Sequence, residues 1–500
     1  MLNQLKFIVK NTAIYSVGNI ATKLAGVILL PLYSKNISIA QFGLLSLFDM
    51  IIDLILSVNG IGIGKALSRW YWDKQYKTDR KAMVFTAYVF YLISSLFFLL
   101  VTFLLLSRFQ HQILQIEIKQ HILHLFLLSL LFKSFIFMPM QVQRIQQKAL
   151  VNTTLNIVNL VFTIVFTVYF LIFRNMELEG VFLARIIGSV AVLIILIPYV
   201  LNQIEFRIQW KLLFEMLRFS WPLVLSDLSS MILALSDRFI INIISTLENV
   251  GIYSIAFRIS NVVKLLVVNA FSQAYVHIFF KSMNAEDRGR LYTKTLTYFV
   301  YMTTFFSLAI SLFAKEILQV FSLGNENYWQ SYPLIPVLIL GIIVNGMRRQ
   351  MVLVMMKERK TRIILLFTII VALLNILLNF LLIPVMGNYG AALATLISQI
   401  VLFTMNNLYI LKKFNEKYEI KKTVLILICF LIIYGTSLLL RDLPLLITIP
   451  AKIVLIVFFP VLLLLFHFYE PIELLRLKQS WKKWRNPKNW KNNISKINFR

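Results

Sequence analysis

Cysteine and charge are both scarce in this sequence. One cysteine, Cys429, occurs in 500 residues, so neither a disulfide framework nor a cysteine-based metal site can form within the chain. Only 14% of the residues are charged, against about 25% in typical soluble proteins, whereas 59% are hydrophobic. A soluble core cannot absorb that much apolar surface, so the composition excludes a series of soluble domains and indicates a membrane protein.

Long apolar runs recur along the whole chain, and each can cross about 30 Å of hydrocarbon as a helix. Segments of alternating polarity, which indicate membrane β-strands, are lacking, and this favours a helical bundle. No cleavable signal sequence is expected, because Met1–Lys10 is polar and the first apolar run is long enough to span. The sequence predicts fourteen spans, at residues 11–33, 41–63, 83–106, 121–140, 151–173, 180–201, 217–244, 250–280, 295–314, 331–356, 363–383, 388–411, 423–440 and 445–468.

Acidic residues are few, with 22 Asp and Glu against 50 Lys and Arg, which gives a formal net charge of +28. Such an excess suggests nucleic acid as a partner, but most of the bases gather in alternate connections between the spans. The opposite connections hold only Lys35, Arg108, Lys119, Arg174, Lys315 and Arg441. The positive-inside rule explains this bias if both termini are cytoplasmic. The charge therefore indicates membrane topology, and no nucleic-acid partner is expected.

The C-terminal residues 471–500 are basic and contain three of the tryptophans, in WKKWRNPKNWKNNISKINFR. A basic segment with tryptophan on the cytoplasmic side is expected to lie on the anionic lipids of the inner leaflet. The alternative is a solvated, frayed tail.

An internal repeat relates the two halves of the chain. With a shift of 208, residues 10–56 align without gaps with residues 218–264, and Gly43 falls on Gly251. EGVFLARIIG (Glu179–Gly188) likewise matches YGAALATLIS (Tyr389–Ser398). Parallel repeats of this kind surround a central pathway in transporters. We therefore expect an N-lobe of six spans at 1–205, a C-lobe of six at 206–415, two further spans at 416–470 and a cytoplasmic tail at 471–500.

Three segments carry a resemblance to a known family. They are NTAIYSVGNIATKLAGVILLPLYSKNISIAQFGLLSLFD, SDRFIINIISTLENVGIYSIAFRI and LNILLNFLLIPVMGNYGAALATLIS, which begin at Asn11, Ser236 and Leu374. The sequence resembles the Wzx-type O-antigen flippases, which belong to the MATE-like MOP exporter superfamily. The resemblance implies an all-α polytopic fold with about 14 transmembrane helices, in two six-helix lobes plus two C-terminal helices.

The resemblance also implies a function. The chain would move a lipid-linked oligosaccharide, carried on undecaprenyl phosphate or pyrophosphate, from the cytoplasmic to the outer leaflet by alternating access, for synthesis of O-antigen, lipopolysaccharide or another surface polysaccharide. Translocation makes and breaks no bond, so no enzyme activity, cofactor or metal is expected, although coupling to H⁺ or Na⁺ is left open. A polysaccharide polymerase and assembly proteins are the expected protein partners.

Ionisable side chains inside spans are costly and usually face a cavity or a partner. In the family that the chain resembles, helices 1, 2, 7 and 8 line the central pathway. The bases expected to bind the substrate phosphate are Lys23, Arg258, Lys264, Arg348 and Arg349. The acids expected to bind a coupling cation, or to pair with the bases, are Asp53, Asp227 and Asp49. The amides and hydroxyl expected to bind sugar are Asn19, Ser226, Asn261 and Asn269.

Structural alternatives stay open for these residues. The bases and acids could be ion pairs between helices, Arg348 and Arg349 could be ordinary interfacial charge, and Lys133 and Arg185 could snorkel to the interface. Asp237 and Arg238 lie near the outer end of the seventh span. They are expected within reach of the interface, as a gate or a structural anchor.

Two other functions compete with the flippase. A multidrug or cation antiporter of the same fold would favour acids in its pocket, and the excess of bases among the membrane charges argues against it. A membrane oligosaccharide polymerase or ligase needs a substantial extracytoplasmic loop or a set of positioned acids and bases. The longest such loop here, Ser107–Gln120, offers His111 and Glu117 without an evident partner set.

Overall fold

The computed structural model describes residues 26–114, 118–281, 288–358, 360–414, 418–440 and 443–475. Every regular element in these ranges is a helix, which confirms the predicted all-α class. Twelve helical stretches are long and apolar enough to cross a membrane, and they coincide with the second to sixth and the eighth to fourteenth predicted spans. The seventh lies in α9 (Trp210–Ile244), and residues 11–25 of the first lie outside the described ranges. The chain is a polytopic membrane protein.

The helices form two compact units. The smaller unit consists of α12 (Arg288–Leu312), α17 (Ile420–Leu438) and α18 (Leu445–Leu465), and the larger unit contains the other helices. The expected lobe boundaries at 205 and 415 stay predictions. Contacts within the chain nevertheless group α12, which was expected in the C-lobe, with the two C-terminal helices.

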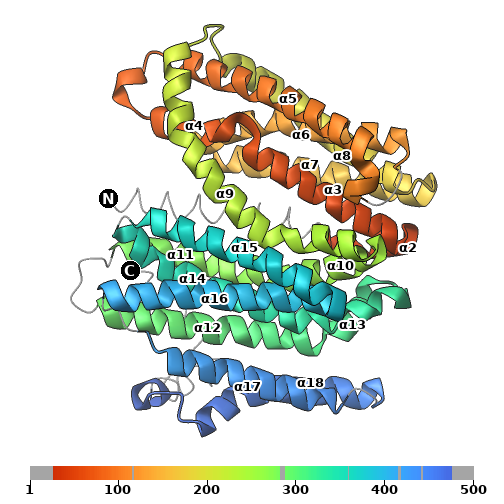
Figure 1. The fold of residues 1–500 in the computed structure, drawn as a ribbon, viewed down its shortest axis with the longest axis vertical. Coiled ribbons are helices and arrows are strands. Elements are labelled where there is room, and N and C mark those ends of the chain that lie inside the picture. The colour runs from red at the N-terminus through yellow and green to blue at the C-terminus, as the bar shows by residue number, and fades with distance from the viewer. Residues whose placement is uncertain are drawn as a thin grey trace, which may run out of the picture. The chain divides into compact units, whose positions relative to one another are not determined.

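Most helices of the larger unit fall into two groups, which also contact each other (Figure 1). The first group comprises α3 (Ile39–Val58), α4 (Ile63–Trp70), α5 (Arg80–Leu114), α6 (Gln120–Ile145), α7 (Ala149–Val168) and α8 (Leu178–Gln203). The second comprises α9, α10 (Leu247–Val263), α11 (Asn269–Lys281), α14 (Leu334–Lys357), α15 (Thr361–Met386) and α16 (Asn388–Phe414). The short helices α2 (Leu30–Asn36) and α13 (Ala314–Phe321), the 3₁₀ turns η1 (Asn59–Gly62), η2 (Lys74–Tyr76) and η5 (Glu326–Ser331), and the π-helices η3 (Tyr169–Phe173) and η4 (Lys264–Val268) complete the described helices.

The internal repeat is visible in how α3 and α10 begin. Ser38 caps α3 by accepting a hydrogen bond from the Gln41 backbone N–H, and Thr246, 208 residues later, caps α10 in the same way with Asn249. Such hydroxyl caps satisfy backbone donors that the first helical turn leaves without partners. The two capped starts therefore have the same local design in both halves of the chain.

The two helix starts also touch each other. A Cβ on Gly43 would lie 2.1 Å from the carbonyl oxygen of Leu247, and a Cβ on Gly251 would lie 2.4 Å from that of Ile39. Ile39 and Leu247 are themselves 208 residues apart, so the contact is symmetric between the repeats. Only glycine allows backbones in membrane helices to approach so closely. The glycine pair that revealed the repeat therefore joins α3 to α10.

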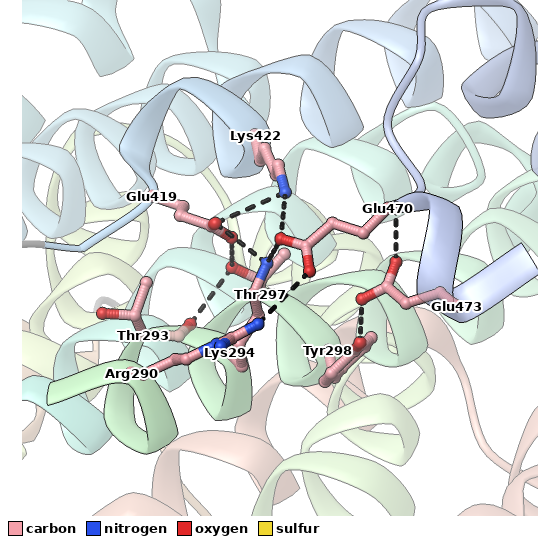
Figure 2. A network of polar contacts seen from close by, with 9 residues as sticks. All are labelled: Arg290, Thr293, Lys294, Thr297, Tyr298, Glu419, Lys422, Glu470 and Glu473. Carbon is pink, nitrogen blue, oxygen red and sulfur yellow. Dashed lines mark hydrogen bonds and ion pairs between the residues drawn. The ribbon is translucent and has the colours of Figure 1, made fainter. Parts of the chain in front are cut away.

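A polar network holds the smaller unit together (Figure 2). Lys294 of α12 bonds to Glu470, which follows α18, and to Glu419 at the start of α17, where the distance is 3.0 Å. Lys422 lies 3.3 Å from Glu419 and 3.5 Å from Glu470. The Thr297 hydroxyl donates to Glu419 at 3.1 Å. Two bases thus bridge two carboxylates from segments that are distant in sequence.

The network predicts a pH-dependent contribution to stability. Hydrogen bonds from Lys294 lower the pKa of Glu470, and they lower that of Glu419 against the opposing effect of burial. A carboxyl whose pKa falls on folding stabilises the folded state above its ordinary value of 4.5, and loses this effect as the pH falls below it. Lys294→Met should therefore lower the thermal midpoint by roughly 2–4 °C at pH 7.

Thermal unfolding of the full chain in detergent, between pH 7 and pH 3.5, measures this difference. The gap between wild type and Lys294→Met should shrink as the pH drops below the ordinary carboxyl pKa. Lys421→Met is the matched control, because the exposed Lys421 is adjacent to Lys422 in sequence but makes no ion pair with the carboxylates of the network in the described part of the chain. A gap that stays constant with pH would contradict the role of the carboxylates.

Candidate functional site

A cavity of about 880 Å³ lies within the larger unit, with walls from α2, α3, α6, α7, α8, α9, α10, η4 and the first residue of α11. Its lining contains more bases than acids. Among the described residues, the six bases are Lys133, Arg144, Arg185, Arg238, Arg258 and Lys264, and the two acids are Asp49 and Asp53. The wall thus has an excess of positive charge, which favours an anionic ligand.

Asp49 on α3 is the centre of the charged wall. Its carboxylate accepts hydrogen bonds from Arg185 of α8 at 2.6 and 3.4 Å, and from Arg258 of α10 at 3.1 Å. Arg258 also lies over the ring of Phe42, 4.8 Å from its centroid. One acid therefore holds two arginines from two different helices, and leaves one positive charge of this cluster without compensation.

Asp53 follows one helical turn after Asp49 and also lines the cavity. Its carboxylate lies 3.9 Å from Lys133 of α6, and both side chains are about half exposed. Lys264 lines the cavity where α10 passes into the π-helix η4. Asn261 and Asn269, predicted as polar ligands, line the cavity on either side of Lys264.

Asp237 and Arg238, expected within reach of the interface as a gate or a structural anchor, both have side chains buried within the protein. Asp237 accepts a hydrogen bond from the Tyr253 hydroxyl of α10. Arg238 lines the cavity, lies 3.8 Å from the centroid of the Phe257 ring, and has a buried Nε without a hydrogen-bond partner among the described residues. Packing of α9 against α10 covers the pair, although it lies near the end of its helix.

Asp227 and the arginine pair of α14 lie outside the cavity lining. Asp227 of α9 forms an exposed ion pair with Lys65 of α4, so it joins the two helix groups. Arg349 donates to the Asn269 side chain at 3.2 Å, and Asn269 lines the cavity. The buried Nε of Arg348 has no hydrogen-bond partner in the part of the chain that the structure describes.

Lys23 and Asn19 lie outside the described residues, as do residues 476–500 of the predicted tail, and the side chain of Ser226 is likewise not described. The cavity bases that sequence reasoning did not assign to the site are Lys133, Arg144, Arg185 and Arg238. Three of them lie inside predicted spans, and a base within a span is the feature of the sequence that could have assigned them to the cavity. Arg144 lies in a predicted connection, where nothing in the sequence marks it.

Contacts between the two helix groups lie on both sides of the cavity along α3 and the turn that follows it. On one side is the glycine contact of α3 with α10. On the other, the Ser220 hydroxyl donates to the Ile61 carbonyl at 2.6 Å, and Lys65 pairs with Asp227. No group of three or more His, Cys, Asp or Glu side chains that could hold a metal occurs among the described residues.

Comparison with known proteins relates this chain to a family and to two proteins of similar sequence. The model of the family described as polysaccharide biosynthesis protein matches residues 8–283. A protein of the Lsg locus of Haemophilus influenzae is 24% identical over 288 residues, which are 55% of this chain and 67% of that protein. An uncharacterized membrane protein of the same organism is 23% identical over 284 residues, which are 55% of this chain and 66% of that protein.

Two solved structures show the same fold. The lipid II flippase MurJ in an inward closed conformation has a TM-score of 0.67 and 16% identity, and the match covers 90% of this chain and 98% of the MurJ chain. The MATE multidrug transporter DinF-BH has a TM-score of 0.59 and 18% identity, covering 82% and 95%.

Proposed function

Because the chain belongs to the polysaccharide biosynthesis protein family, we propose that it is a flippase for a lipid-linked oligosaccharide. The observation that carries this proposal is the cavity wall, in which six bases face two acids. A substrate on undecaprenyl phosphate or pyrophosphate brings negative charge to the point where its sugar joins its lipid. The fold shared with the lipid II flippase MurJ supports a carrier of this kind.

The cavity residues suggest how such a substrate crosses. The isoprenoid tail stays in the hydrocarbon, while the phosphate and sugar cross through the cavity. Arg258 and Arg185 offer guanidinium groups that can bind phosphate oxygens, and Asp49 holds both when no anion is present. Rocking of the two helix groups about the cavity would open it to each leaflet in turn.

Direction and location follow from the charge of the connections. The bases of alternate connections support an orientation in which both termini are cytoplasmic. In the bacterial inner membrane, the substrate would then load at the inner leaflet and leave at the outer leaflet. The product would serve surface polysaccharide synthesis, with O-antigen as one candidate. A polymerase and assembly proteins would act on it next, and H⁺ or Na⁺ could couple the cycle.

A second candidate is a drug or cation exporter, because the MATE multidrug transporter DinF-BH shares the fold. Cationic drugs would meet an excess of positive charge in this cavity. Like charges inside a cavity disfavour binding, so the wall supports the flippase over the exporter.

The test replaces the cavity arginines. Arg258→Ala and Arg185→Ala should each lower surface glycan at least about tenfold in a strain that depends on this chain, since a hydrogen bond to a charged group contributes about 1.5–3 kcal/mol. The lipid-linked precursor should accumulate, and membrane levels of the protein should stay normal. Arg108→Ala, an exposed arginine outside the cavity lining, is the matched control. Normal surface glycan in both cavity variants would refute the proposal.

A further inference from the structure

The cavity face of α7 is polar but carries no charge. Asn156, Asn159 and Thr163 line the cavity at spacings of three and four residues, so they lie on one face of the helix. The opposite side of α7 exposes apolar side chains, which are Leu150, Val151, Ile157, Val161, Phe162 and Val165. The lining residues from α7 include no charged side chain, whereas α3, α6, α8, α9, α10 and η4 each contribute at least one. The other helices without a charged lining residue, α2 and α11, contribute one side chain each, Tyr33 and Asn269.

The amides of this face keep hydrogen-bonding groups available to the cavity. Asn156 donates to the Asn152 carbonyl at 2.9 Å, but its side-chain oxygen accepts no bond from any described residue. The Asn159 side-chain oxygen accepts from Thr163 at 3.2 Å, while its amide nitrogen has no partner within the described ranges. One acceptor and one donor therefore remain open on neighbouring turns.

Asn152, one turn before Asn156, is an asparagine of the same helix whose role is structural. It is buried, donates to the Met140 carbonyl of α6 at 3.0 Å, and lies 3.4 Å from Arg144 Nε. Asn152 thus joins α7 to α6. Asn156 and Asn159 make no such bond to a neighbouring helix within the described ranges, although polar side chains at membrane depth are costly unless they face a partner or a wet cavity.

We propose that Asn156, Asn159 and Thr163 form a carbohydrate-binding subsite, separate from the bases that bind the phosphate. An asparagine amide offers two donors and an acceptor in one plane, which suits neighbouring sugar hydroxyls. Neutral ligands of this type bind a sugar ring without competing for the phosphate. This subsite rests on the proposed function, and it assigns to α7 the selection of the head group.

The test measures binding of two kinds of probe to the full chain in nanodiscs. One probe is undecaprenyl diphosphate without sugar, and the others carry glucose, galactose or N-acetylglucosamine on the same diphosphate. The wild type should bind at least one sugar probe about tenfold more tightly than the bare diphosphate, as expected for two hydrogen bonds. Asn156→Ala/Asn159→Ala should abolish this preference and bind the bare diphosphate within about twofold of wild type.

Two further variants separate the subsite from the proposed function. Thr154→Ala removes an exposed hydroxyl of α7 that does not line the cavity, and it should keep the sugar preference. Arg258→Ala should weaken both kinds of probe by a similar factor. Equal binding of all probes by the wild type, or an intact preference in the asparagine double variant, would overturn the subsite alone. No binding by the wild type, or no effect of Arg258→Ala, would overturn the flippase and the subsite with it.

Discussion

Gly43→Ala and Gly251→Ala should each lower transport at least about tenfold, although each adds only one methyl group. The new Cβ would lie 2.1 Å from the Leu247 carbonyl oxygen in the first variant and 2.4 Å from the Ile39 carbonyl oxygen in the second. These neighbours are backbone atoms at helix starts, so no side chain can move aside. Overpacking of this kind costs about 1–3 kcal/mol, which shifts a conformational equilibrium by roughly 5- to 150-fold. Because the added atom would meet backbone at such short range, we expect the upper part of that range.

The consequence should be a cavity that no longer closes at the end where α3 and α10 begin. A Cys429→Ala background removes the single native cysteine, and Asn261→Cys then reports access to the cavity wall. We expect labelling by a membrane-impermeant maleimide from that side to increase about tenfold in both glycine variants. Surface glycan, measured in strains that carry each glycine variant with native Asn261 and Cys429, should fall in parallel.

Gly341→Ala is the matched control for the glycine variants. Gly341 is also buried in a long helix, α14, but a Cβ there would meet only the Leu396 Cα at 3.8 Å, an ordinary contact. It should keep normal labelling and transport. Wild-type labelling in Gly43→Ala together with normal surface glycan would show that the close contact plays no part in the working cycle.

The sequence predicts where the helices lie in the chain, but it does not predict which helices pack against each other. Length and hydropathy place the spans, because any membrane helix must satisfy its own backbone and present apolar side chains. The repeat identifies Gly43 and Gly251 as equivalent positions, but equivalence does not show that they touch. Their contact depends on how the two halves pack, which a shift in sequence does not specify. The grouping of α12 with α17 and α18 is hidden for the same reason.

The candidate site shows the same limit at the level of side chains. Depth within a span indicates that Asp49, Asp53, Arg258 and Lys264 avoid lipid, and the structure places all four on the cavity wall. Depth does not fix the direction a helix face points, because lipid and protein interior are both apolar. Asp227 is an example: it is predicted at a similar depth, but it pairs with Lys65 and does not line the cavity.

Asp49→Asn should separate binding from transport. The variant keeps the shape of the side chain but removes the charge that holds Arg185 and Arg258. Two unit charges about 4 Å apart interact by roughly 1 kcal/mol in water and roughly 4 kcal/mol near a protein surface. Because the Asp49 side chain is 34% exposed to the cavity, we expect the lower part of that range, and hence about tenfold tighter binding of undecaprenyl diphosphate.

Transport by Asp49→Asn should nevertheless fall, because the arginines then have no carboxylate to which they return when the anion leaves. Tighter binding with lower surface glycan is the opposite of Arg258→Ala, in which both should fall. Asp53→Asn is the matched control, since its carboxylate lies 3.9 Å from Lys133 in a more exposed pair and should change binding less than about threefold. Weaker diphosphate binding in Asp49→Asn would show that Asp49 positions the arginines for the anion. Tighter binding would show that Asp49 competes with the anion for them, and that release of the arginines is a step of the cycle.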